Sequence, residues 1–174
     1  MTETVPEPNL AALRLPAPAV PPGTVVVTED GQGVFSQYLL DGRHQLTADE
    51  PVAAGGDDLG PGPYELLLMA LGACTSMTLR MYAKMHGWPL DRVIVRLSHT
   101  RSYAKDCAEC AVKEGMLDEL VREIEILGAL DETQAARLME MADKCPVHRT
   151  FTGQIRITTR RGGLEAVAPL GGSV

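Results

Sequence analysis

The sequence has no excess of positive charge. Lysine and arginine together number 16 against 23 aspartates and glutamates, which gives a formal net charge of −7 at pH 7 and a pI near 5.1. A surface of this sign repels phosphate backbones and anionic lipid head groups. We therefore expect neither nucleic acid nor a membrane as a partner.

The sequence also gives no indication of a signal peptide or of a membrane-spanning segment. The first ten residues, MTETVPEPNL, have neither the cationic start nor the apolar core of a signal peptide. The longest apolar run, residues 66–79, is interrupted by Thr75, Ser76 and Thr78 and is closed by Arg80, so it is too short to span a bilayer. We expect a cytoplasmic protein with reduced thiols, in which this run is a core helix.

The composition is that of one soluble domain with a sizeable core. Of the 174 residues, 45% are hydrophobic and 22% are charged. Half of the 12 prolines lie within residues 1–22, a composition that favours extended conformations over packing, so residues 1–23 are predicted to be a flexible arm. Residues 24–160 are the predicted domain, and residues 161–174 are predicted to be a flexible tail.

Strand and helix patterns alternate along this domain. Three short segments bounded by turn residues, TVVVTED, VFSQYLLDG and RHQLTAD, predict a three-stranded meander. Residues 64–86 predict a long helix that is buried nearly all round, because methionines recur at multiples of four: Met69, Met77, Met81 and Met85.

The second half of the domain has the same mixed character. Residues 90–103 alternate between apolar and polar side chains and predict a strand. Residues 116–128 fit either helix or strand, and their β-branched residues favour a strand from about Leu120. A helix is predicted over residues 131–144 and a last strand over residues 153–160.

Two cysteines occupy segments suited to thiol chemistry. Cys74 lies in the apolar helix, which should bury it, and Cys145 precedes Pro146 at the end of the next helix, where a thiol can be exposed. His148 and Arg149 follow within one turn, and positive charge near sulfur lowers the pKa of a thiol. Taken by itself, the helix favours Cys74 as a small core residue at a helix crossing.

The segments PYELLLMALGACTSMTLRMYA and ADKCPVHRTFTGQIRIT resemble the OsmC/Ohr family of osmotically inducible and organic hydroperoxide resistance proteins. The resemblance covers about residues 25–159. It implies an α/β (α+β) fold in which antiparallel sheets pack around a long central helix, in an intertwined homodimer. It also implies a thiol-dependent peroxidase for oxidative-stress defence, in which Cys74 attacks an organic hydroperoxide, becomes a sulfenic acid and is resolved by Cys145. No cofactor is expected, only an external dithiol reductant.

The sequence departs from the family pattern at two positions. The family has a glutamate directly after the proline that opens the helix, but here Tyr64 follows Pro63 and Glu65 comes one place later, which turns its carboxylate by ~100°. We keep Glu65 as a candidate catalytic residue beside the two cysteines.

The second departure is a missing arginine. The stretch QLTADEPVAAGG, which should supply it, contains none, and Arg43, Arg80, Arg101 and Arg149 are the substitutes considered. Without a nearby cation, a thiol in an apolar site has a raised pKa and reacts slowly at neutral pH. The alternative is a non-catalytic protein on the same scaffold that binds an apolar, lipid-like small molecule or senses redox state.

Two further cysteines, Cys107 and Cys110, have a spacing used in metal and redox sites. A zinc site normally needs a second such pair, which the sequence lacks, so no metal site is assigned. An auxiliary redox pair and two reduced loop cysteines are the other interpretations. His44 and His86 are predicted to be surface or turn residues.

Overall fold

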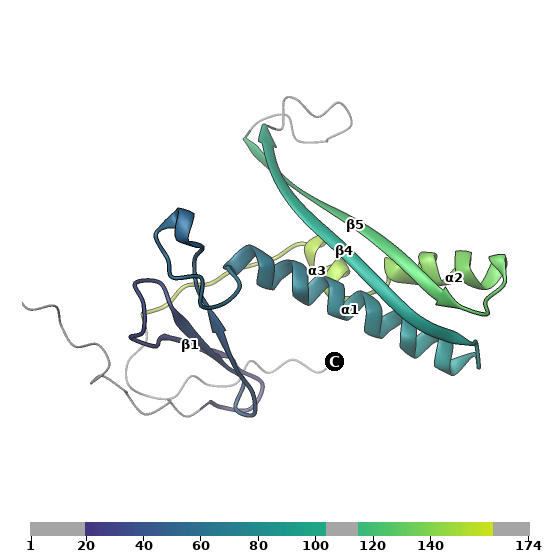
Figure 1. Ribbon diagram of the computed structural model, residues 1–174, viewed down its shortest axis with the longest axis horizontal. Helices are drawn as coiled ribbons and strands as arrows, with labels where there is room; N and C mark the ends of the chain where they lie inside the picture. Colours follow the sequence, from purple (N-terminus) through teal and green to yellow (C-terminus); the bar gives the residue numbers. More distant parts are fainter. Residues whose placement is uncertain (1–19, 104–114, 162–174) are drawn as a thin grey trace, which may run out of the picture. The chain divides into compact units, whose positions relative to one another are not determined.

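The computed structural model describes residues 20–103 and 115–161, and these form two compact units of chain (Figure 1). The first unit runs up to Pro63 and resumes at Thr158, and the second comprises Tyr64–Ile157. The predicted arm and tail lie outside the described residues, except for residues 20–23 and 161. The expected mixed fold, with antiparallel sheets and a long helix, is confirmed.

The first unit contains the predicted meander. Its strands are β1 (Val26–Glu29), β2 (Gln37–Leu40) and β3 (Gln45–Ala48), paired antiparallel in that order. In the register of the sheet, Val26 lies opposite Leu40 in one pair of strands and Gln37 lies opposite Ala48 in the other. The short strands end at Asp and Gly turns, as their sequences predict.

The second unit is built on the predicted long helix, α1 (Pro63–Met85). Pro63 suits the first helical position, where its missing N–H costs nothing, and Gly87 follows the last turn with a φ of 65°, which only glycine adopts easily. The helix is followed by an antiparallel pair, β4 (Leu90–Tyr103) and β5 (Met116–Gly128). Residues 116–128 are therefore a strand, as favoured, and it begins four residues before Leu120.

Two helices complete the second unit. The first, α2 (Glu132–Ala142), begins with a capping box in which Asp131 and Gln134 exchange side-chain hydrogen bonds with each other's backbone N–H. The second, α3 (Pro146–Phe151), is a short helix where the sequence predicted only a turn, and Cys145 is its N-cap residue. The core of the unit lies where α1 and α2 meet the start of β4, around Leu79, Ala83, Leu90, Leu138 and Ala142.

The prediction of a last strand over residues 153–160 is wrong for the described chain. Residues 154–161 belong to no helix or strand, and Ile155 and Ile157 are 58% and 84% exposed. An alternating pattern identifies a segment that can pair and bury one face, but a strand also needs a neighbour to which its backbone can bond. None of the described strands pairs with this segment.

The expectation that α1 is buried nearly all round is also wrong. Five of its residues are buried, whereas its four periodic methionines are 57–70% exposed. The reason is that β4, β5 and the two later helices cover one side of α1 only. By length and composition α1 could cross a membrane, but core helices of soluble proteins pass the same test, so the finding assigns no membrane role.

Candidate active site

The two cysteines singled out in the sequence meet in the structure. Cys74 lies midway along α1, Cys145 is the N-cap residue of α3, and the two thiols lie close enough for each to shift the pKa of the other. Both are free thiols. The fold therefore brings together two sulfurs that are 71 residues apart in sequence, a contact that the sequence itself could not establish.

The exposure of the two sulfurs is the reverse of that expected. Cys145, predicted to be accessible, has a relative exposure of 0%, and Cys74, predicted to be buried, is partly exposed. Cys145 is enclosed because the turn into α3 lies against α1, whereas Cys74 lies nearer the uncovered side of α1. A small molecule arriving from solvent therefore meets Cys74 first.

The surroundings of Cys145 favour its thiolate form. Burial opposes the charge, but the Cys74 thiol, the backbone N–H groups of His148 and Val147 and the Thr75 hydroxyl all favour it. Together they lower the pKa of Cys145 below its ordinary value of 9.0. The N–H groups are the unpaired donors that every helix start provides.

The surroundings of Cys74 have the opposite effect. Burial raises the pKa of Cys74, and so does the neighbouring Cys145 thiol; the Val147 N–H and the Thr78 hydroxyl lower it, but too weakly to reverse the shift. Because the two thiols are coupled, the first proton lost belongs to the pair, and the resulting charge lies mainly on Cys145.

A cation that the sequence analysis did not consider lies next to this pair. Arg122 of β5 donates from Nη1 to Thr75 Oγ1 at 3.1 Å and to the Ala142 carbonyl at 3.2 Å, and from Nη2 to Asp143 Oδ1 at 2.7 Å. The alternation of residues along β5 could have identified this arginine from the sequence. Arg122 shares the inward face of β5 with Ile124 and Ile126, where a charged side chain needs buried partners.

The arginines that were considered have other partners or lie elsewhere. Arg80 donates to the backbone carbonyls of Leu90 and Asp91, and Arg101 lies 3.7 Å from Asp118. In the first unit, the stretch expected to supply an arginine instead has Asp49, whose buried carboxylate accepts three backbone N–H groups of its own loop. That carboxylate holds the loop in shape.

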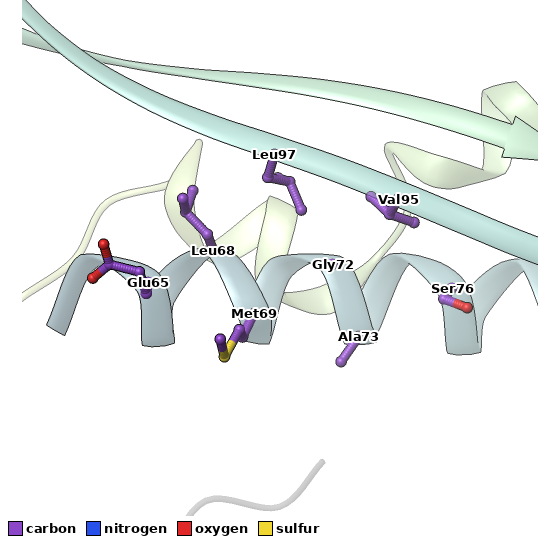
Figure 2. Close-up of a pocket in the computed structure, with 8 residues that line it drawn as sticks. All are labelled: Glu65, Leu68, Met69, Gly72, Ala73, Ser76, Val95 and Leu97. Carbon is purple, nitrogen blue, oxygen red and sulfur yellow. The ribbon is translucent and has the colours of Figure 1, made fainter. Parts of the chain in front are cut away.

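A groove in the second unit lies apart from the two thiols. It is an open groove of about 480 Å³ between α1 and β4, shown in Figure 2. Its lining residues are Glu65, Leu68, Met69, Gly72, Ala73, Ser76, Val95 and Leu97. Cys74 is two residues from both Gly72 and Ser76, which places it about 200° around the helix from each. The groove and the thiol pair therefore lie on opposite faces of α1.

Glu65 belongs to the groove. Figure 2 shows its carboxylate at the N-terminal end of α1, beside Leu68. It precedes Cys74 by nine residues, about half a turn around the helix axis and roughly 14 Å along it. The single chain does not bring Glu65 to the thiols, and its catalytic role stays a prediction.

The remaining candidates are placed as follows. His99 stacks on Tyr64 with ring centroids 4.3 Å apart, and its Nε2 lies 2.9 Å from Asp118 Oδ1. Within residues 20–103 and 115–161, no group of three or more potential ligands could hold a metal ion. Cys107 and Cys110 lie outside the described residues, so the hypotheses about them stay open.

Comparison with known proteins identifies the scaffold. A family model described as OsmC-like protein matches residues 55–160. The OsmC like protein from Mycoplasma pneumoniae is 25% identical, with a TM-score of 0.56 over 75% of this chain and 85% of that one. An organic hydroperoxide resistance protein OsmC from Legionella pneumophila is 20% identical, with a TM-score of 0.54 over 75% and 90%.

A third solved structure is similar to the same extent. The organic hydroperoxide resistance protein OhrB of Bacillus subtilis is 21% identical, with a TM-score of 0.51 over 75% of this chain and 91% of that one. No curated protein matches the sequence. At these identities the structural likenesses show a common fold.

Proposed function

The chain belongs to the OsmC-like family, and from that premise we propose that it is a thiol-dependent peroxidase that reduces organic hydroperoxides through Cys74 and Cys145. One observation carries the proposal: the two thiols are close neighbours, and the more exposed one lies where a substrate can reach it. Two of the similar structures are organic hydroperoxide resistance proteins, which supports this class of substrate.

The proposed reaction needs no cofactor. The Cys74 sulfur attacks one oxygen of the hydroperoxide, the O–O bond breaks, and the alcohol leaves, so that Cys74 becomes a sulfenic acid. The Cys145 sulfur then attacks the Cys74 sulfur, water leaves, and a disulfide forms. An external dithiol reduces this disulfide by exchange and restores both thiols. Because the sulfurs are already in contact, the second step needs only a small movement.

We also propose that the working form is the intertwined homodimer of the family. Support comes from two surfaces that the single chain leaves uncovered. One is the methionine face of α1, formed by Met69, Met77, Met81 and Met85, and the other is the extended segment 154–161 with its exposed isoleucines. A second copy could cover both surfaces.

Steady-state consumption of cumene hydroperoxide and of hydrogen peroxide, with a dithiol reductant, tests the peroxidase. We expect preference for the organic peroxide and loss of turnover in Cys74→Ser. The matched control is the double variant Cys107→Ser/Cys110→Ser, which removes two cysteines and should keep turnover. Unchanged turnover in Cys74→Ser would refute the proposal.

The groove supports a second candidate function, which is the binding of an apolar small molecule without turnover. Half of its lining residues are Leu, Met or Val, one carboxylate lies at the end, and the groove is separate from the thiols. Native mass spectrometry of the purified protein tests this. A co-purified ligand that is lost on Ser76→Leu, together with no peroxide turnover, would favour binding over catalysis.

A further inference from the structure

One hydroxyl group separates Arg122 from the buried thiol. Nη1 of Arg122 donates to Thr75 Oγ1 at 3.1 Å, and the same hydroxyl lies close enough to the Cys145 sulfur to favour its thiolate form. Thr75 has a relative exposure of 0%, and the Arg122 side chain is 14% exposed. These three groups form a chain from a cation on β5 to the sulfur at the start of α3.

The hydroxyl of Thr75 has one proton to donate and two lone pairs that accept. Arg122 uses one lone pair, so the proton has two possible acceptors, the Leu71 carbonyl at 2.8 Å and the Cys145 sulfur. When Cys145 is ionised, the anion is the stronger acceptor. Donation from the guanidinium polarises the hydroxyl further and strengthens its bond to a thiolate.

The other charged and titratable groups around Cys145 do not replace Arg122 in this role. They are Cys74 on α1, Asp143 at the end of α2 and His148 on α3, and His148 Nδ1 lies 3.8 Å from Asp143 Oδ1. Asp143 bonds Arg122, but it is 63% exposed, so water screens its charge more than that of the enclosed guanidinium.

We propose that Arg122 is a positioning residue for the thiol pair: acting through the Thr75 hydroxyl, it holds the negative charge on Cys145, so that Cys145 accepts the proton of Cys74 as Cys74 attacks. This role rests on the proposed peroxidase function. It gives the chain a cation for its thiol chemistry even though the loop before α1 contains no arginine.

The proton and the electrons balance in this step. Cys74 gives its proton to the Cys145 thiolate while its sulfur forms a bond to the outer peroxide oxygen, and the electrons of the O–O bond leave with the alkoxide. The alkoxide takes the proton from Cys145 and becomes the alcohol, which leaves Cys145 as the thiolate that closes the disulfide.

Direct titration of Cys145 tests this role without relying on turnover. In full-length chain carrying Cys74→Ser, Cys107→Ser and Cys110→Ser, Cys145 is the single thiol, and its ionisation is followed by the ultraviolet absorbance of the thiolate against pH. We expect Arg122→Gln and Thr75→Val each to raise the midpoint by about one pH unit, with Arg122→Lys in between. Asp143→Asn, which frees the guanidinium from a carboxylate, should lower the midpoint or leave it unchanged.

Arg96→Gln is the matched control, because Arg96 also pairs with a carboxylate, Glu125, but lies exposed on β4. If circular dichroism shows that Arg122→Gln does not fold, Thr75→Val still tests the role. It removes the hydroxyl through which Arg122 acts and keeps the bonds of Arg122 to Ala142 and Asp143. The role of Arg122 is refuted if both variants keep the midpoint of the Arg96→Gln control. A midpoint that depends on Arg122, in a protein without peroxide turnover, would refute the peroxidase and leave this role standing.

Discussion

The two faces of α1 differ in what covers them, and this difference decides their chemistry. On the face of Cys74, Thr75 and Thr78, later elements of the chain lie against the helix and give its polar groups partners. Next to it, the methionine face is open, and Met77 and Met81, three and seven residues after Cys74, lie within about 60° of it around the helix. One helix of fairly uniform apolar sequence thus has a reactive face and an uncovered face. Proximity to β5 and α3, rather than the helix itself, distinguishes Cys74 from a small core residue.

The largest effect is expected from Cys145→Ser, which removes the contact that defines the reactive face. Turnover should fall by about a hundredfold or more, because the sulfenic acid on Cys74 has no thiol to resolve it. The first equivalent of peroxide should still react. Mass spectrometry with a sulfenic-acid trap checks this, and the expected product is one trapped adduct on Cys74 per chain. Full turnover, or an adduct elsewhere, would contradict the assignment of the two cysteines.

The sequence predicted the elements of this reactive face better than its contacts. The long helix and the strand over residues 90–103 carry clear periodic patterns, and both are observed. The pairing of Cys74 with Cys145 came from the resemblance to a family, since distance between remote residues is not encoded in local pattern. Arg122 was missed for the same reason, because its partners Thr75 and Asp143 come from α1 and the end of α2.

Errors of the sequence analysis concern surfaces that the single chain does not cover. Apolar periodicity at Met69, Met77, Met81 and Met85, and alternation over residues 153–160, identify faces that need a partner but not which chain supplies it. The pattern was therefore interpreted as burial and pairing within one chain. Met77 is 70% exposed and Ile157 is 84% exposed, and the proposed second copy would cover both.

A charge on the open face should break the homodimer. Met77→Glu is expected to raise the dimer dissociation constant by about a hundredfold or more, because burying an unpaired carboxylate costs ~3 kcal/mol or more. Sedimentation velocity measures this. Met139→Glu is the matched control, since Met139 is a similarly exposed methionine, at 45%, on α2. Unchanged association in both variants, or a monomeric parent protein, would refute the dimer through this face.

The opposite pKa shifts of the two thiols predict opposite pH dependence of stability. In Cys74→Ser, Cys145 is the thiol of the pair that remains, and its folded pKa lies below 9.0. The folded state therefore binds fewer protons, and the free energy of unfolding should increase as pH rises from the folded pKa towards 9.0. In Cys145→Ser, burial of Cys74 raises its folded pKa above 9.0, so that stability is complete below this pH and decreases above it.

Urea unfolding of both variants under reducing conditions, between neutral pH and about one unit above the ordinary thiol pKa, measures these slopes. Other titrating groups, Cys107 and Cys110 included, are common to the two variants and cancel in the difference. If the free energy of unfolding changes with pH by the same sign and size in both variants, the two sulfurs do not have opposite pKa shifts.

The smallest effect on turnover is expected from Glu65→Gln, on the groove side of α1. Glu65 lies about half a turn around the helix from Cys74 and roughly 14 Å along it, too far to donate to or repel the reacting sulfur within one chain. We expect kcat/KM for cumene hydroperoxide to stay within about threefold of the unsubstituted chain. A loss of tenfold or more would mean that Glu65 acts on the thiols of a second copy. The loss should then disappear in the Met77→Glu background, where the copies are separate. The comparison there is between Met77→Glu/Glu65→Gln and Met77→Glu alone.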